Sequence, residues 1–150
     1  MKQILCLGDA CADIVIPYGA AKSGMHVFPD FSCGGTAANT ASGLGRLGAD
    51  CTFLGKAGDD FFGRTMKNAL QNDGVNTDYF ILDQNLSSVL ILVVIDEKNE
   101  RFPFLMPREN PSHLQLFDED IPDRLFRQVS FVHTSAESFD NHAAKINTAA

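Results

Sequence analysis

The sequence predicts an α/β fold around a parallel sheet, and the order of its apolar segments carries this prediction. Residues 3–7 form a continuous apolar run stopped by a glycine, and residues 50–55 again have the pattern of a strand. Such runs are typical of strands buried on both faces of a parallel sheet. Residues 34–48 and 61–70 instead carry apolar side chains at helical spacing. Strand, helix, strand and helix in succession favour parallel strands that are joined by helices.

The rest of the chain adds short strands and one more helix to this pattern. Residues 14–16 and 26–29 are short extended segments with prolines at their ends, which predicts edge strands outside the main sheet. Residues 88–105 contain two apolar runs around a polar turn, which predicts a hairpin inserted between the βα units. A helix is expected around residues 118–128 and a strand at 129–133, and the chain ends in what resembles the opening of another helix.

Length and composition limit the classes of protein that this chain can be. Its 150 residues are 45% hydrophobic, enough for one compact domain or part of a larger one. The formal net charge is -7 and no run of lysine or arginine offers a track for a phosphate backbone, so no nucleic-acid partner is expected. The amino-terminal apolar run is shorter than a signal peptide and nothing approaches a membrane span, so a soluble cytoplasmic protein is expected.

The cysteines and histidines give no pattern of a metal site. Cys6, Cys11, Cys33 and Cys51 contain no CxxC pair and have small or apolar neighbours, which is typical of reduced thiols packed as small hydrophobes. A disulfide framework or a metal site is the weaker alternative. The four histidines share no spacing with each other or with acidic residues, so core or surface roles are expected for them.

A glycine pair marks the first candidate site. Gly34 and Gly35 stand where an extended segment turns into a helix, and Asn39 follows one turn later. Glycine allows a polyhydroxyl ligand to approach the backbone closely, the helix start supplies free N–H donors, and the Asn39 amide can both donate and accept hydrogen bonds. The alternative is a tight turn with a capping role and an asparagine solvated on the helix surface.

Asp13 lies a few residues beyond the first predicted strand, at the end where open α/β sheets bind ligands. Asp13 can accept two hydroxyl hydrogen bonds with its carboxylate, although a solvated loop position is the competing interpretation. Asp9 comes directly after Gly8, and a role in a turn or a helix cap explains it without a ligand.

The segment from Gly43 to Gly48 matches G-x-G-x-x-G, the pattern of dinucleotide-binding proteins. That pattern must follow a strand and open a helix, so that the pyrophosphate meets the helix N-terminus. Here it follows TAANTAS and closes a helix instead. These glycines are therefore predicted to allow close packing of the helix and to end it at Gly48. The apolar face of this helix is expected to hold Ala37, Ala41, Leu44 and Leu47.

Two charged features are open to more than one interpretation. Asp59 and Asp60 are adjacent and point in different directions, so turn and cap chemistry at a helix N-terminus explains them better than a metal or acid/base pair. Arg108 lies in a loop after the predicted hairpin, where it could contact an anion or a sugar from a lid, or be a solvated arginine.

Taken in order, these features resemble the ribokinase-like (PfkB) carbohydrate kinases. A GD-AxxDI-type start at residues 8–14 precedes the block GGTAANTASGLGRLGADCTFLGKAGDDFFG at residues 34–63, and a hairpin like that family's lid follows. The paired glycines, the asparagine after a short gap, the small residues and the later glycines fit the first family signature. The match covers essentially the whole chain.

The resemblance implies a fold, a set of site residues and an assembly. The fold is a doubly wound, Rossmann-like α/β core with a small β lid over the sugar, formed from about residues 13–33 and 88–106. Exposed lid strands make a homodimer through the lid an expectation. The residues implied to contact a small sugar are Asp13, Gly34, Gly35, Asn39, the lid-proximal Arg108 and, near a position used by some members, Glu137.

The implied activity is that of an ATP-dependent sugar kinase. At the glycine turn the sequence of ribokinases resembles GGKGAN, whereas this chain has Thr36 and Ala37 in place of the lysine and the glycine. This difference favours a hexose such as fructose, or a keto-sugar acid such as ketodeoxygluconate, over ribose as the substrate. The family motifs D-T-x-G-A-G-D and N-x-x-E do not occur in these residues. ATP, Mg²⁺ and the catalytic base are therefore expected to belong to a carboxyl-terminal part beyond residue 150, and residues 1–150 alone are expected to be inactive.

Two other functions stay open from the sequence. One is a non-catalytic sugar-binding module or pseudokinase, which would bind sugar without ATP turnover. The other is a dinucleotide-dependent oxidoreductase, which would require a strand directly before Gly43.

Overall fold

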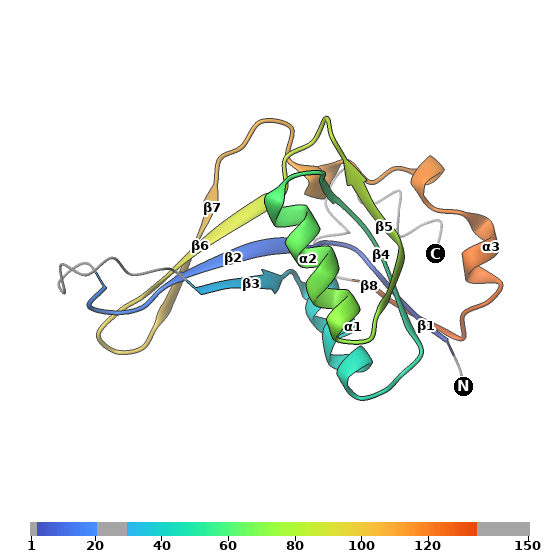
Figure 1. The fold of residues 1–150 in the computed structure, drawn as a ribbon, viewed down its shortest axis with the longest axis horizontal. Coiled ribbons are helices and arrows are strands. Elements are labelled where there is room, and N and C mark those ends of the chain that lie inside the picture. Colours follow the sequence, from blue (N-terminus) through green and yellow to red (C-terminus); the bar gives the residue numbers. More distant parts are fainter. Residues whose placement is uncertain (1–2, 21–29, 135–150) are drawn as a thin grey trace.

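The computed structural model describes residues 3–20 and 30–134 and arranges them in two sheets (Figure 1). Sheet A is parallel, in the order β5-β4-β1-β8, and sheet B is mixed, in the order β3-β2-β6-β7. The strands of sheet A are β1 (Ile4–Leu7), β4 (Cys51–Gly58), β5 (Asn76–Asp83) and β8 (Phe131–Thr134). Those of sheet B are β2 (Cys11–Ile16), β3 (Asp30–Gly34), β6 (Val89–Ile95) and β7 (Arg101–Met106).

Apolar layers cover both faces of sheet A. Helices α1 (Thr36–Arg46) and α2 (Phe61–Asn72) pack on one face, where alanines of α1 and Met66 of α2 meet Phe53 and Phe80. The other face holds leucines of β1 and β4 against Leu116, Ile121 and Leu125. Successive side chains of β1 alternate between the two layers, as a strand buried on both faces requires. The predicted α/β class with a parallel sheet is confirmed.

The chain crosses between the two sheets four times, and these crossings position the candidate site. Residues 8–10 lead from β1 into β2, and Gly35 alone separates β3 from α1. Residues 84–88 lead from β5 into β6, and the chain returns after β7 through residues 107–111. Sheet B consequently projects beyond the layer of α1 and α2 (Figure 1).

Sheet B corrects one prediction about the edge strands. The segment expected at residues 14–16 is the longer strand β2, and it is central, because β3 and β6 pair with it on either side. Pro17 follows the last residue of β2, so it interrupts no ladder hydrogen bond. The strand expected at residues 26–29 and the helix opening at the end of the chain lie outside the described residues.

Three other predictions from the sequence were wrong or incomplete. The helix expected at residues 118–128 is broken into the 3₁₀ turn Asp118–Asp120 and the one-turn helix α3 (Asp123–Phe126), because Pro122 cannot donate a backbone hydrogen bond and constrains the residue before it. Strand β5 was missed between α2 and the hairpin. Leu47 is 85% exposed, because it stands past the last residue of α1.

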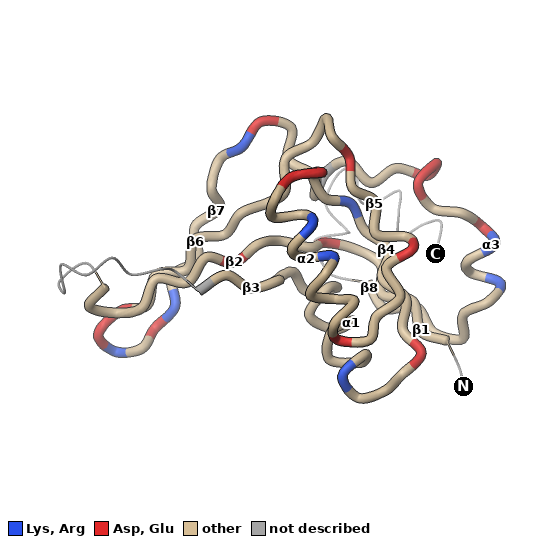
Figure 2. The backbone as a smooth tube through the Cα atoms, viewed as in Figure 1, with Lys and Arg blue, Asp and Glu red and all other residues tan. Residues whose placement is uncertain are grey.

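The described residues show how the charges are distributed and where the cysteines lie. Lysine and arginine are scattered along the described chain among acidic residues (Figure 2). All four cysteines are free thiols, with Cys6 and Cys51 buried and their sulfur atoms 3.8 Å apart. None of the helices among the described residues is both long and apolar enough to cross a membrane.

Gly45 and Gly48 have the structural roles that the sequence predicted, whereas an added Cβ at Gly43 would meet open space. An added Cβ at Gly45 would collide with the carbonyl oxygen of Asp73, which follows α2. Gly48 has φ +79° and its N–H donates to the carbonyl of Gly45, so it ends the helix. Gly45 thus lets the end of α1 pack against the end of α2, and no strand precedes Gly43 as a dinucleotide fingerprint would need.

Two alanine substitutions in α1 should have opposite effects on stability. Gly43→Ala adds a Cβ into open space and should raise the free energy of unfolding by about 0.5–1 kcal/mol, because alanine loses less backbone entropy in a helix. Gly45→Ala should lower it by roughly 1–3 kcal/mol, because the added methyl meets backbone that has to move. Thermal or urea unfolding of the two variants measures both; equal effects would contradict the packing role of Gly45.

Candidate functional site

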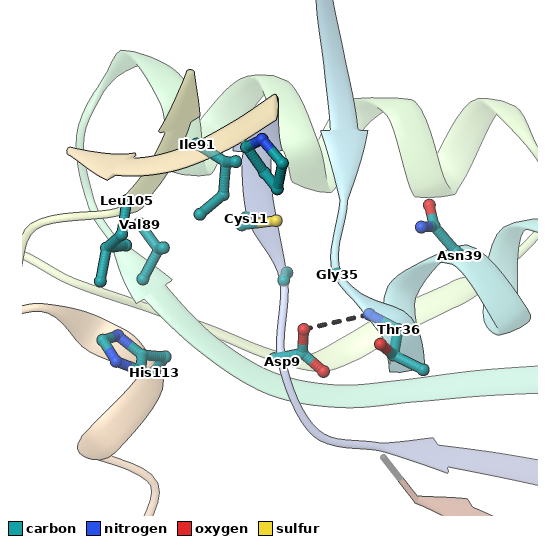
Figure 3. Close-up of a pocket in the computed structure, with 11 residues that line it drawn as sticks. Asp9, Cys11, Gly35, Thr36, Asn39, Val89, Ile91, Leu105 and His113 are labelled. Atoms are coloured by element: carbon teal, nitrogen blue, oxygen red, sulfur yellow. Dashed lines mark hydrogen bonds between the residues drawn. The ribbon is translucent and has the colours of Figure 1, made fainter. Parts of the chain in front are cut away.

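A cavity of about 590 Å³ lies where the end of β1, the start of α1 and sheet B meet (Figure 3). It is formed at the first two crossings between the sheets, at the carboxyl end of a parallel strand, where open α/β sheets bind ligands. Its lining is polar on the side of β1 and α1 and mainly apolar on the side of sheet B. This two-sided lining is typical of sites for small molecules that carry both hydroxyl groups and a carbon skeleton.

Asp9 organises the polar side of the cavity. Its carboxylate accepts hydrogen bonds from the backbone N–H groups of Thr36 at 3.0 Å and Ala37 at 3.4 Å, and its carbonyl oxygen accepts from that of Ala38 at 3.3 Å. The capping role predicted for Asp9 is confirmed, and the cap comes from a distant part of the chain. The expectation that the start of α1 supplies free donors is wrong for these three N–H groups, because Asp9 uses them.

The glycine pair makes room for two carboxylates. Gly35 has φ +98°, and an added Cβ would lie 2.7 Å from the carbonyl oxygen of Asp9. At Gly34 an added Cβ would lie 2.6 Å from a carboxylate oxygen of Asp13. Position 35 therefore requires glycine, and a side chain at position 34 would displace the Asp13 carboxylate. The close approach that the sequence predicted is an approach between parts of the protein itself. Gly35 also lines the cavity.

Asp13 stands in the middle of β2 and is connected to the cavity through Cys11. The Cys11 thiol, which lines the cavity, donates to a carboxylate oxygen of Asp13 at 3.3 Å. Burial, with the charge of Asp13 nearby, raises the pKa of Cys33 to about 12 and that of Cys11 well above its ordinary value. Both thiols are therefore protonated at neutral pH, which suits the donor role of Cys11. Asp13 itself is half-buried and does not line the cavity directly.

Asn39 and Thr36 extend the polar side along α1. Both side chains are exposed and line the cavity, and Figure 3 shows them on the helix that begins beside Asp9. The Asn39 backbone N–H donates to the carbonyl of Gly35 at 2.8 Å, which holds the residue in the first turn. Its amide is thereby presented to the cavity from a rigid element.

The apolar side of the cavity belongs to the β6–β7 hairpin. Val89 and Ile91 of β6 face it together with Pro103 and Leu105 of β7, all two residues apart, as side chains on one face of a strand must be. His113, in the 3₁₀ turn after the hairpin, completes this side (Figure 3). Its Nδ1 atom is buried and has no hydrogen-bond partner within the described part of the chain.

Of the two remaining predicted site residues, only Arg108 lies among the described residues. Arg108 is not among the residues that line the cavity; its guanidinium donates to Asp60 at 3.2 Å and lies 5.6 Å from the centre of the Phe62 ring. Its side chain is 26% exposed, so it is not the solvated arginine of the alternative interpretation. Glu137 lies outside the described residues. The sugar contacts implied for both stay predictions.

The adjacent carboxylates of Asp59 and Asp60 have separate roles, as predicted. Asp60 caps α2, accepting from the N–H of Gly63 at 2.9 Å, and Asp59 pairs with Arg64 at 2.7 Å on the surface. Among the described residues, no three His, Cys, Asp or Glu side chains gather as a metal site.

Reasoning from the sequence missed several residues of the cavity. Asp9 follows β1 immediately, so the rule about carboxyl ends of parallel strands applied to it more directly than to Asp13. The alternation of the hairpin could have identified its cavity-facing residues once one of them was known. His113 gave no signal, because its position depends on how the chain returns after β7.

Comparison with known proteins shows which family the chain resembles. The model of the pfkB family carbohydrate kinases matches residues 1–150. A fructokinase of Vibrio alginolyticus is 31% identical over 150 residues, which are 99% of this chain and 45% of that protein. An aminoimidazole riboside kinase of Salmonella typhimurium is 29% identical over 147 residues, 97% of this chain and 42% of that protein.

A solved structure supports the same assignment. The crystal structure of fructokinase with bound ATP from Xylella fastidiosa superimposes with a TM-score of 0.83 at 28% identity, covering 99% of this chain and 45% of that one. The chain thus spans less than half the length of each of these three relatives. The match over the entire chain and the shared fold show that it belongs to the pfkB family of carbohydrate kinases.

Proposed function

We propose that the complete protein is an ATP-dependent sugar kinase and that residues 1–150 are the amino-terminal part of its kinase domain, carrying the sugar-binding half. The observation that supports this most is the cavity between the two sheets, with Asp9, Thr36 and Asn39 on one side and the apolar hairpin on the other. Hydroxyl groups of a sugar would meet the polar side, and the C–H groups of its ring would meet the apolar side.

Asp13, Gly34, Gly35 and Asn39 remain the proposed sugar contacts, together with Arg108 and Glu137. Asp13 would reach a hydroxyl group from β2, with the Cys11 thiol shifting away from its carboxylate. A carboxylate that accepts from a hydroxyl makes a charge-assisted hydrogen bond, which favours a polyhydroxyl ligand over an apolar one. The residues of sheet B, within segments 13–33 and 88–106, would form the lid that covers the sugar and excludes water.

The proposed substrates are fructose, ketodeoxygluconate or a related small sugar. Thr36 and Ala37 at the glycine turn support a hexose or keto-sugar acid over ribose. The chain is similar both to a fructokinase and to an aminoimidazole riboside kinase, so a riboside is the main competing substrate class.

ATP, Mg²⁺ and the catalytic base would come from residues beyond 150. When bound, MgATP would supply the phosphoryl group that the sugar's hydroxyl attacks after the base removes its proton. The role of residues 1–150 would then be to bind and orient the sugar and to exclude water, so this part alone would not catalyse transfer. The alternative is a non-catalytic sugar-binding protein or pseudokinase.

The proposed setting is the cytoplasm, and the proposed assembly is a homodimer through the lid. Phe102, Phe104 and Met106 of β7 are 43%, 53% and 40% exposed, and by alternation they lie on the face of sheet B opposite the cavity. An edge strand with an exposed apolar face supports pairing with a second copy.

A coupled ATP assay of the complete protein tests the proposed function. Fructose, ketodeoxygluconate, ribose and aminoimidazole riboside are compared at equal concentration, and turnover with fructose or ketodeoxygluconate is expected to be at least tenfold above that with ribose or with the riboside. Sugar binding by calorimetry without turnover of ATP would favour the pseudokinase alternative. Turnover only with a riboside would contradict the proposed substrate class.

Asp13→Asn in the complete protein should lower kcat/KM for the sugar by roughly ten- to a hundredfold, because a charged hydrogen bond to a hydroxyl group is lost. Steady-state kinetics measure this. Asp50→Asn, an exposed aspartate away from the cavity, is the matched control and should leave kcat/KM within twofold. Unchanged kinetics of Asp13→Asn would remove this residue from the site.

Asn39→Ala should raise KM for the sugar by about three- to tenfold, because a neutral hydrogen-bonding side chain of the cavity is removed. Thr40→Ala is the matched control, since Thr40 is the next residue of α1 and its hydroxyl donates within the helix to the carbonyl of Thr36 at 3.0 Å. Its KM should stay that of the unmodified protein. Equal KM values in both variants would show that Asn39 does not contact the sugar.

A further inference from the structure

One carboxylate, that of Asp60, receives hydrogen bonds from three separate segments. Its Oδ1 accepts from the Gly63 N–H at 2.9 Å and from the Ser88 hydroxyl at 2.7 Å. Its Oδ2 accepts from the Ser88 N–H at 3.1 Å and from the Arg108 guanidinium at 3.2 Å. The cap of α2 alone needs only the first of these bonds. The other three join the helix to Ser88 and Arg108.

Ser88 and Arg108 are the two ends of the β6–β7 hairpin. Ser88 is fully buried and directly precedes Val89, the first residue of β6. Arg108 follows the last residue of β7, Met106, by two positions. Asp60 therefore holds the third and the fourth crossing between the sheets at a single point. The β6–β7 hairpin extends from this point into sheet B.

The surroundings of this point leave it little freedom. An added Cβ at Gly58 would lie 2.7 Å from the Ser88 nitrogen, and one at Gly63 would lie 2.9 Å from the Ser88 hydroxyl oxygen. Ser87 donates to the carbonyl of Asn110 at 3.0 Å, so the two ends of the hairpin are also bonded to each other. The segment before β6 thus packs directly on the backbone around α2.

The charge of Asp60 is maintained by its partners. Burial by itself would raise the pKa of Asp60, but the hydrogen bonds from Gly63 and Ser88 and the charge of Arg108 outweigh burial and lower it below its ordinary value. The carboxylate is therefore ionised at neutral pH, with a cation on one side. Arg108 also stacks over Phe62, the second residue of α2, which fixes the guanidinium from a second direction.

We propose that Asp60 is a positioning residue for the sugar site. It does not line the cavity, yet the hairpin that it holds supplies the apolar wall through Val89, Ile91, Pro103 and Leu105. The hydrogen bond from the Arg108 guanidinium to Asp60 also orients Arg108, the arginine proposed to contact the sugar. This inference rests on the proposed function, and it adds that the affinity for sugar depends on a carboxylate outside the cavity.

Asp60→Asn in the complete protein separates positioning from capping. The amide oxygen can still accept from the Gly63 N–H and cap α2. The amide NH₂ group would then face the donors of Ser88 and Arg108, which need an acceptor. KM for the sugar should rise about five- to twentyfold, with kcat and the KM for ATP within twofold, because the hairpin wall is displaced while the chemistry is untouched.

Asp59→Asn is the matched control. It removes a carboxylate one residue away that forms an ion pair with Arg64 on the surface, where such pairs contribute little, and KM for the sugar should not change. An equal rise of KM in both variants, or none in either, would overturn the proposal.

Arg108→Gln, alone and combined with Asp60→Asn, tests the coupling. If Asp60 and Arg108 act through the contact that they share, the double variant should have the KM of the weaker-binding single variant. Multiplied effects of the two substitutions would mean independent roles and would overturn the coupling. Arg108→Gln alters a partly exposed side chain, so it keeps the test available where Asp60→Asn does not fold.

Hydrogen exchange of the β6 amides separates this proposal from the proposed function, because it needs no activity. Their exchange should be about tenfold faster in Asp60→Asn than in Asp59→Asn, since the hairpin loses its attachment to α2. Faster exchange in a protein that phosphorylates no sugar would leave the role of Asp60 in holding the hairpin intact and would overturn the proposed function alone. Unchanged exchange would overturn the role of Asp60.

Discussion

Helices α1 and α2 each begin at a carboxylate that also fixes a crossing between the sheets. Asp9 bonds the first N–H groups of α1 from the segment that joins β1 to β2, and Asp60 caps α2 while binding both ends of the β6–β7 hairpin. The positive end of a helix attracts a negative charge, so the two carboxylates stabilise the helices and the crossings together. These bonds link the segments that lead into and out of sheet B to the helices that cover sheet A.

The cavity follows from this arrangement, because it forms where the crossings open a space between the sheets. Its polar side is the first crossing and the helix that Asp9 caps, and its apolar side is the hairpin that Asp60 holds. Glycine is required at position 35, where a side chain would meet the backbone at Asp9, and a side chain at position 34 would displace the carboxylate of Asp13. The proposed sugar contacts and the residues that define the fold are therefore the same residues or direct neighbours.

Much of this architecture could be predicted from the sequence, because it is encoded locally. Apolar runs, helical spacing and the polar turn of the hairpin gave the order of most elements. The position of Gly43 to Gly48 at the end of a helix excluded a dinucleotide fingerprint. Strand β5 was missed because no such cue was recognised between α2 and the hairpin. The glycine pair predicted that some group lies close to the backbone there. Neighbouring residues alone could not show that the groups are Asp13 and the backbone of Asp9.

Long-range contacts account for the rest. The partners of Asp9 are 27 and 28 residues away and those of Asp60 up to 48 residues away, so no spacing rule brings them together. The helix expected around residues 118–128 failed for a local reason, since Pro122 was present in the sequence and was given too little weight. The resemblance to a family supplied the site residues that local patterns left ambiguous.

The Cys11 thiol has a consequence for the chemical resistance of the site. A cysteine in a binding cavity is usually a point of attack by oxidants and alkylating reagents, which react with the thiolate. Here burial and the neighbouring carboxylate of Asp13 keep the sulfur protonated, so the thiol is a hydrogen-bond donor and a poor nucleophile. A protonated thiol reacts more slowly with these reagents than a thiolate does, so Cys11 should be modified less readily than a cysteine of ordinary pKa.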